Sequence, residues 1–154
     1  MHSYMAVGIY DEHSGAEIVL SAFLRSDFDP GRLSVVGKEH HRDPSADDYR
    51  RSADRMLYAG KFGTFWVAGP LTASIVDGMD VHPPAADLSV LGVGLFMHGI
   101  PCEAASRYEA AVRSDKYLLV LRGSEADAGR AAAIMRAGAE MVRLHTAKLR
   151  DLDG

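Results

Sequence analysis

The apolar residues of this chain fall into two similar strand–helix–strand units, one near each end. The first unit has three predicted elements: a strand over Tyr4–Tyr10, an amphipathic helix over Ser14–Arg25 and a strand over Leu33–Val36. The second unit repeats them: a strand over Tyr117–Leu121, a helix over Ser124–Ala137 and a strand over Met141–Leu144. Short apolar runs bounded by turn residues indicate strands, and apolar residues three and four apart indicate helices.

Each predicted helix has one apolar stripe and a capping residue at its start. The first stripe consists of Ala16, Val19, Leu20, Phe23 and Leu24, and the second of Ala128, Ala131, Ala132 and Met135. Ser14 and Ser124 precede these stripes and have the hydroxyl that an N-cap requires. Two such units predict an α+β fold, a ferredoxin-like α/β sandwich in which a four-stranded antiparallel sheet has both helices on one face.

The residues between the units predict a long insertion. Gly37–Arg55 is polar and is expected to be an exposed loop, whereas Met56–Ile100 is apolar and rich in glycine. The Val81–Pro84 break divides this part into two helix-like stretches, roughly 53–76 and 85–98, in which small residues would let the helix backbones approach closely. Cys102–Ser114 is predicted as a further helix.

These elements predict one domain over residues 1–154. Its parts are the first unit over 4–37, the insertion over 38–115, the second unit over 116–145 and a short tail over 146–154. A sheet with an uncovered apolar face is unstable. We therefore expect the insertion or a second subunit to cover the face that the two repeated helices leave open.

Composition narrows the class of protein. The chain has 154 residues, of which 47% are hydrophobic and 25% charged, as in an ordinary globular domain. A net charge of −4 argues against a general nucleic-acid binder. The single cysteine, Cys102, cannot form an internal disulfide, so a reducing, cytoplasmic location is expected. The first residues do not predict a secretory signal, and the uncharged run Phe62–Val76 is shorter than the roughly 20 residues of a membrane-spanning helix.

A series of short pieces runs along most of the chain: 7–11, 33–38, 54–56, 60–66, 68–71, 99–101, 107–109 and 115–123. Their order and spacing resemble the general stress protein 17M-like family, a group of small bacterial stress-associated proteins. The resemblance implies a stress-associated role and no established reaction, so it supplies no catalytic residues. Family members commonly have a longer glycine-rich apolar hairpin after the Phe-Trp pair. Here Asp77, Asp80, His82 and the two following prolines interrupt it, which favours a soluble form.

The densest group of metal-type ligands is Glu39, His40 and His41, with Asp43 nearby. Imidazole and carboxylate groups suit divalent metals, but adjacent residues of an extended segment point to opposite sides. A solvated loop is the alternative interpretation. His82 and His98 could join the group only through the tertiary structure, and no cofactor is predicted.

The other candidate residues are cationic or nucleophilic. Cys102 begins a predicted helix, where the helix dipole can activate a thiol, although an incidental cysteine is the simpler interpretation. Arg107 and Tyr108 could bind a phosphate or carboxylate. Alternatively, Tyr108 packs on the sheet while Arg107 and Glu109 form surface ion pairs. Lys38 and Lys61 are further candidates for an anion site; a solvated face is again the alternative.

Three functions follow from these patterns. The leading hypothesis is a non-enzymatic protein that acts by binding or by self-assembly as a homodimer, because the aromatic, glycine-rich insertion suits a partner chain. The second is a small-molecule or metal-binding protein, or an enzyme, with a site between sheet and insertion that includes His40, His41, Arg107 and Tyr108. The third is peripheral membrane association through the apolar insertion.

Overall fold

A computed structural model describes residues 2–11, 19, 21–23, 25–26, 30–38, 55–60, 63–83 and 88–148 of the chain. Its elements are, in order, β1 (His2–Tyr10), the 3-10 turn η1 (Pro30–Arg32), β2 (Leu33–Lys38), β3 (Arg55–Gly60), β4 (Gly63–Ala68), α3 (Leu71–Gly78), α4 (Val90–His98), α5 (Cys102–Arg113), β5 (Tyr117–Gly123), α6 (Glu125–Met135) and β6 (Met141–Lys148). Val19 and residues 21–23 are also helical, within the helix predicted over Ser14–Arg25.

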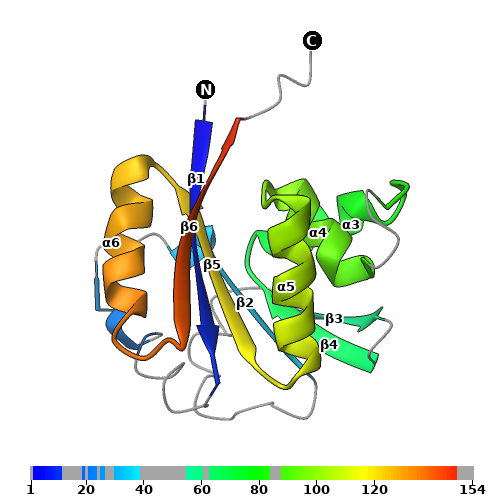
Figure 1. Ribbon diagram of the computed structural model, residues 1–154, viewed down its shortest axis with the longest axis horizontal. Coiled ribbons are helices and arrows are strands. Elements are labelled where there is room, and N and C mark those ends of the chain that lie inside the picture. Colours follow the sequence, from blue (N-terminus) through cyan, green and yellow to red (C-terminus); the bar gives the residue numbers. More distant parts are fainter. Residues whose placement is uncertain are drawn as a thin grey trace.

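The strands form one six-stranded sheet in the order β3-β4-β2-β5-β1-β6, and every neighbouring pair is antiparallel. The predicted α+β class and antiparallel sheet are therefore confirmed. The expected number of four strands is wrong, because the hairpin of β3 and β4 extends the sheet beyond β2. Figure 1 looks along the sheet from β6 at the front to β3 behind, with α6 on one face and α3–α5 on the other.

The hairpin of β3 and β4 replaces most of the helix predicted over 53–76; only α3 is helical there. Aromatic and β-branched residues favour a strand, in which successive side chains point to opposite faces. Phe65 accordingly stacks on Tyr58 with ring centroids 5.9 Å apart, whereas Trp66 lies against Tyr117 at 6.5 Å. Phe65 and Trp66 therefore belong to different hydrophobic cores on opposite faces of the sheet. Gly63, with φ of 113°, begins the second strand of the hairpin.

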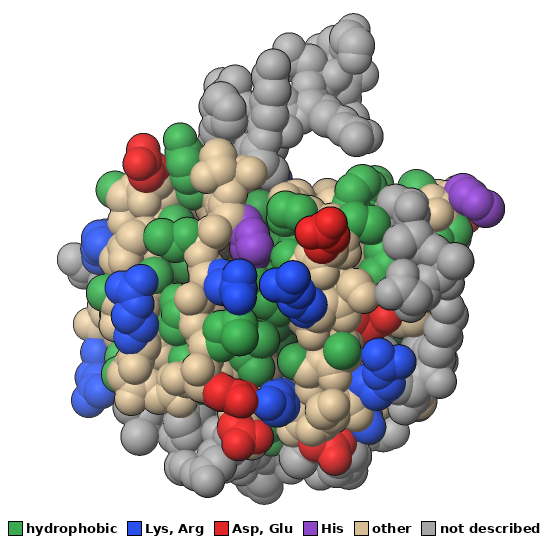
Figure 2. All heavy atoms as spheres, viewed as in Figure 1, with side chains coloured by type: hydrophobic (Ala, Val, Ile, Leu, Met, Phe, Trp, Pro, Cys, Tyr) green, Lys and Arg blue, Asp and Glu red, His purple; other side chains and the backbone are tan. Residues whose placement is uncertain are grey.

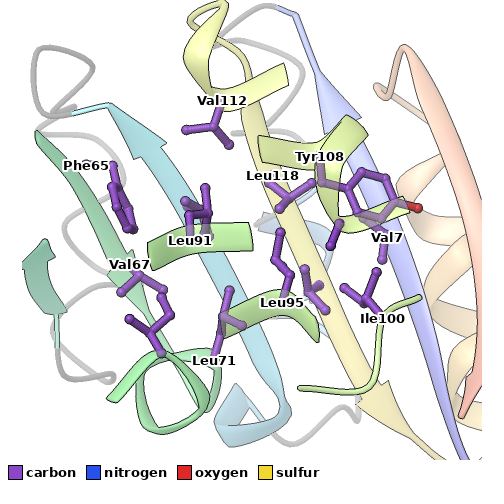
Figure 3. Close-up of a cluster of buried hydrophobic side chains, with 14 of the residues drawn as sticks. Val7, Phe65, Val67, Leu71, Leu91, Leu95, Ile100, Tyr108, Val112 and Leu118 are labelled. Carbon is purple, nitrogen blue, oxygen red and sulfur yellow. The ribbon is translucent and has the colours of Figure 1, made fainter. Parts of the chain in front are cut away.

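The central strand β5 supplies side chains to two separate hydrophobic cores. Leu118 and Val120 point to the core beneath α3, α4 and α5, which is drawn in Figure 3. Tyr117, Leu119 and Leu121 point to the core beneath α6 and the helical segment at Val19. α6 and the helical residues Val19 and 21–23 thus lie on one face of the sheet, and α3, α4 and α5 cover the other.

Three buried or capping side chains fix where the helices begin. The predicted cap Ser124 accepts a hydrogen bond from the Asp127 amide at 3.1 Å. The hydroxyl of Ser34 in β2 accepts a hydrogen bond from the Leu71 amide at 2.9 Å and so holds the start of α3 against the sheet. The side chain of Glu109 in α5 is buried against the start of α4. It accepts hydrogen bonds from the amides of Ser89 (2.8 Å) and Gly92 (2.9 Å) and from the Ser89 hydroxyl. The expectation that Glu109 forms a surface ion pair is therefore wrong.

Replacing Glu109 by Gln should lower the free energy of unfolding by about 1–2 kcal/mol. The change removes the negative charge that faces the positive end of α4, and it weakens charge-assisted hydrogen bonds. Urea unfolding followed by circular dichroism measures the effect. Glu103→Gln is the matched control because Glu103 is exposed in the first turn of the same helix; it should change stability by less than about 0.5 kcal/mol. Equal effects of the two substitutions would contradict the role of Glu109.

The α3–α4 contact depends on a missing side chain. A Cβ atom at Gly94 would lie 2.3 Å from Ile75 Cγ1 and 2.9 Å from Ile75 Cα, which is closer than real atoms approach. The expectation that small residues allow close helix packing in this segment is confirmed at this position. Gly129 in α6 is the contrasting case, since a Cβ there would meet nothing within 4 Å.

Alanine substitutions at these two glycines should change stability in opposite directions. Gly94→Ala should destabilise the protein by about 1–3 kcal/mol, because α3 and α4 must move apart. Gly129→Ala should stabilise it by about 0.5–1 kcal/mol, because alanine is the better helix former and the site has room. Thermal and urea unfolding check both values, and a loss of stability at Gly129 that matched the loss at Gly94 would refute the packing argument.

Candidate functional site

The described residues form a pocket of about 310 Å³ where the central helices meet one end of the sheet. Four elements line it: η1 supplies Gly31 and Arg32, α3 supplies Ala73 and Ser74, α4 supplies His98, and β5 supplies Arg122; Pro70 lies before α3. The lining thus combines two guanidinium groups, a hydroxyl and an imidazole, and it contains no acidic side chain.

His98 is the most buried polar residue of this pocket, with 2% of its surface exposed. Its Nδ1 is 2.8 Å from the Ser74 hydroxyl, and its Nε2 has no hydrogen-bond partner among the described residues. Burial, and then the nearby positive charge of Arg122, lower the pKa of His98 to about 4. The imidazole is therefore neutral at physiological pH.

Two arginines give the pocket its positive charge. Arg122 follows the apolar run of β5, and its Nη1 donates to the His98 carbonyl oxygen at 3.3 Å, which joins the strand to the end of α4. Arg32 donates to Asp127 of α6 at 3.1 Å, and its side chain is 51% exposed. Asp127 also lies 3.7 Å from Arg130, so its charge is shared between two arginines. The pocket itself keeps an excess of positive charge.

This arrangement suits anion binding better than nucleophilic catalysis. Guanidinium groups bind carboxylates and phosphates through paired hydrogen bonds. The Ser74 hydroxyl is a further donor when His98 carries its proton on Nδ1 and donates it to the Ser74 oxygen. An activated serine would instead need a general base with a pKa near the working pH. Burial and Arg122 lower the pKa of His98 to about 4, which disfavours that role, and its hydrogen bond to Ser74 fixes the position of the hydroxyl.

The candidate residues Arg107 and Tyr108 lie elsewhere, at the seam between α5 and β6. Tyr108 is buried, as one of the two interpretations expected, and its hydroxyl is hydrogen bonded to Nε2 of His145. Burial raises the pKa of Tyr108 to about 12, although Arg143 and Arg107 act in the opposite direction. Burial and Arg143 lower the pKa of His145. The pair is therefore neutral, and two exposed arginines lie near Tyr108.

The remaining candidates do not meet in one site within the described part of the chain. Lys38 forms an ion pair with Asp115 at 3.3 Å. Cys102 is half-buried at the start of α5, as predicted. Lys61, Glu39, His40 and His41 lie outside the described residues.

The possible metal ligands are separated where the structure shows them. His82 is exposed, whereas His98 is buried in the pocket. In the described ranges, no group of three His, Cys, Asp or Glu side chains is placed to hold a metal ion.

Sequence reasoning missed the pocket because its polar residues belong to separate segments. His98 lies 24 positions after Ser74 and 24 positions before Arg122, too far for any local motif, and Arg32 is more distant still. One signal was available: Arg122 directly follows the apolar run Tyr117–Leu121. A charged residue at the end of a strand buried on both faces is a reasonable candidate for a site at the edge of the core.

Stability should fall in acid because of His98. The folded pKa of about 4 lies below the ordinary histidine pKa of 6.5, so the unfolded chain takes up the proton first as the pH falls. The contribution of neutral His98 to the free energy of unfolding is present above about pH 6.5 and is lost as the pH falls towards 4. Between pH 7.5 and 5, His98 should account for a loss of about 2 kcal/mol.

Urea unfolding at these two pH values, compared with His98→Asn, measures this contribution. Asparagine can still bond to Ser74 but does not titrate, so the variant should lose about 2 kcal/mol less than the natural chain. An equal loss in both proteins would show that His98 does not carry the pH dependence.

Comparison with known proteins leaves the chain without an assigned relative. No protein-family model, no curated protein and no solved structure matches it. The resemblance to the general stress protein 17M-like family therefore stays a prediction from the sequence.

Proposed function

We propose that this protein binds a small anionic ligand, a carboxylate or phosphate compound, in the pocket between the sheet and the central helices. The observation that carries the proposal is the placement of Arg32 and Arg122 with the Ser74 hydroxyl around one pocket whose lining has no acidic group. This is the second of the functions considered from the sequence, but with different residues. For that function, the sequence also predicts a site between the sheet and the insertion.

The neighbours of the pocket support binding in preference to catalysis. A charged ligand would receive paired hydrogen bonds from Arg122 and a hydroxyl from Ser74, while the apolar Pro70 and Ala73 would contact its carbon skeleton. The neutral His98 adds no charge that would change with pH in the physiological range. The pocket volume of about 310 Å³ suits a metabolite-sized molecule.

We further infer that β2, β5, β1 and β6 constitute a ferredoxin-like unit, with the central residues 38–115 as its insertion. Two observations support this inference. The four strands are neighbours in that order, and β1 and β2 are both antiparallel to β5, so they run in the same direction. A helix on one face follows the first strand of each pair, as a repeated β-α-β unit requires.

The other sequence-based expectations are retained as proposals. They are a homodimer, no nucleic-acid partner, and a non-enzymatic, stress-associated role in the cytoplasm. None of the helices in the described ranges is long and apolar enough to cross a bilayer. Peripheral association with a membrane through the apolar insertion stays a proposal.

Titration with inorganic phosphate and with succinate tests the pocket. Arg122→Met should weaken the binding of the preferred anion at least about tenfold, because a bidentate charged contact is lost. Calorimetry or chemical-shift titration gives the affinities, and comparison of the two anions distinguishes a phosphate from a carboxylate site. Arg113→Met is the matched control: it removes one exposed arginine at the end of α5 and should leave the affinity unchanged.

Two further results complete this test. Ser74→Ala should cause a smaller loss than Arg122→Met, because a neutral hydrogen bond is weaker than a charged one. Circular dichroism must show that each variant is folded. If Arg122→Met and Arg32→Met both retain the affinity of the natural chain for the two anions, or if neither anion binds the natural chain, the proposed function is wrong.

A further inference from the structure

Among the described strands, β6 lies at one edge of the sheet. It is the last strand in the sheet order and pairs along one side with β1, from His2 opposite Lys148 to Ile9 opposite Met141. No described strand pairs with its other side. β6 continues four residues beyond the strand predicted over Met141–Leu144 and into the predicted tail. An edge of this length presents a row of backbone N–H and C=O groups that another extended segment can use.

Two exposed arginines, Arg143 of β6 and Arg107 of α5, lie beside this edge. Figure 2 looks onto β6 and shows Lys or Arg side chains and a histidine gathered over the seam between β6 and α5. Arg143 and Arg107 are exposed and lie close enough to affect the titration of Tyr108, while His145 is hydrogen bonded to that tyrosine. Among the described residues, neither arginine has an ion-pair partner; Nε of Arg143 instead contacts the sulfur of Met141 at 3.3 Å.

The two faces of the edge differ in character. Val142 packs against the core beneath α6, so Leu144, two residues further along the strand, lies on the same face. Leu144 is 55% exposed, which leaves an apolar side chain at the edge on that face. Arg143 and His145 lie on the opposite face, beside α5. A strand added here would meet positive charge on one face and apolar surface on the other.

Charge also determines which kind of segment can pair with the β6 edge. Arg143 of β6 and Arg107 of α5 are exposed cations beside this edge, His145 is neutral, and β6 contains no acidic residue. Antiparallel pairing of two β6 strands would place Arg143 and Arg107 of both copies along one edge, and like charges on neighbouring strands are destabilising. A second copy of the chain is therefore disfavoured at this edge, whereas a segment with acidic side chains is complementary to it.

We propose that the β6 edge binds an extended acidic peptide segment, which adds to the sheet as a seventh strand. Backbone hydrogen bonds to β6 hold the segment, and carboxylates on alternate residues pair with Arg143 and Arg107. The intervening apolar residues pack on Leu144. This site is separate from the anion pocket, since it is formed by β6 and α5 and shares no residue with that lining.

Fluorescence anisotropy with a labelled peptide of about ten residues, alternating Glu and Val, tests the proposal. The natural chain should bind it saturably. Arg143→Glu should lower the affinity at least about tenfold, and Arg107→Glu should act in the same direction. Arg113→Glu controls for the change in net charge and should alter the affinity by less than about twofold. Arg143 is exposed, so Arg143→Glu should melt like the natural chain; if it does not, Arg107→Glu decides.

Three comparisons separate strand addition from other modes of binding. A Glu/Val peptide with N-methyl groups on the backbone amides along one side should not bind, because it cannot donate to β6. A Lys/Val peptide should not bind either. Oligouridylate should bind more weakly than the acidic peptide.

Each opposite result overturns the proposal. Equal binding of the N-methylated peptide would show that no strand is added, and tighter binding of oligouridylate would show a nucleic-acid surface. A concentration-dependent dimer in sedimentation that Arg143→Glu abolishes would show that a second copy occupies the edge. An absence of saturable binding by the Glu/Val peptide would refute the proposal outright.

Discussion

Burial of β5 on both faces is the constraint on which the rest of the structure depends. Tyr117–Leu121 is apolar at every position, and alternate side chains enter different cores. A strand of this kind is stable only when both faces of its sheet are covered. The repeated helices cover one face, so the central segment must cover the other, and it does so with α3, α4 and α5. Within the described residues, helices of the same chain therefore cover both faces of β5.

The anion pocket is a consequence of this second layer. To cover the sheet, α3 and α4 pack so closely that Gly94 has no room for a side chain, and the helix ends meet the end of β5 beside η1. That junction brings the Ser74 hydroxyl and the His98 imidazole next to Arg122. The same packing buries Glu109, whose carboxylate is held by the amides at the start of α4. Stability and the candidate site thus share one set of helix contacts.

The two proposed binding surfaces show why net charge is a poor guide to partners. The chain carries a formal charge of −4, yet Arg32 and Arg122 are placed in one pocket and Arg107 and Arg143 along one seam. Net charge is a sum over the whole sequence and describes solubility and long-range attraction, whereas recognition of a partner depends on where the unbalanced charges lie. Both surfaces are suited to anions, but one is concave and metabolite-sized and the other is an open strand edge.

The sequence alone determined the elements whose pattern is local. Strands β1, β2, β5 and β6 and helices α5 and α6 were predictable, because their period and caps lie within each segment; Ser124 is an example. The β3–β4 hairpin was mistaken for helix, since a short apolar, glycine-rich run fits either structure until its neighbours are known. Only the tertiary structure decided that Glu109 is buried and that Ser74, His98 and Arg122 meet. Contacts between distant segments depend on how whole elements pack, and residue spacing contains no record of that packing.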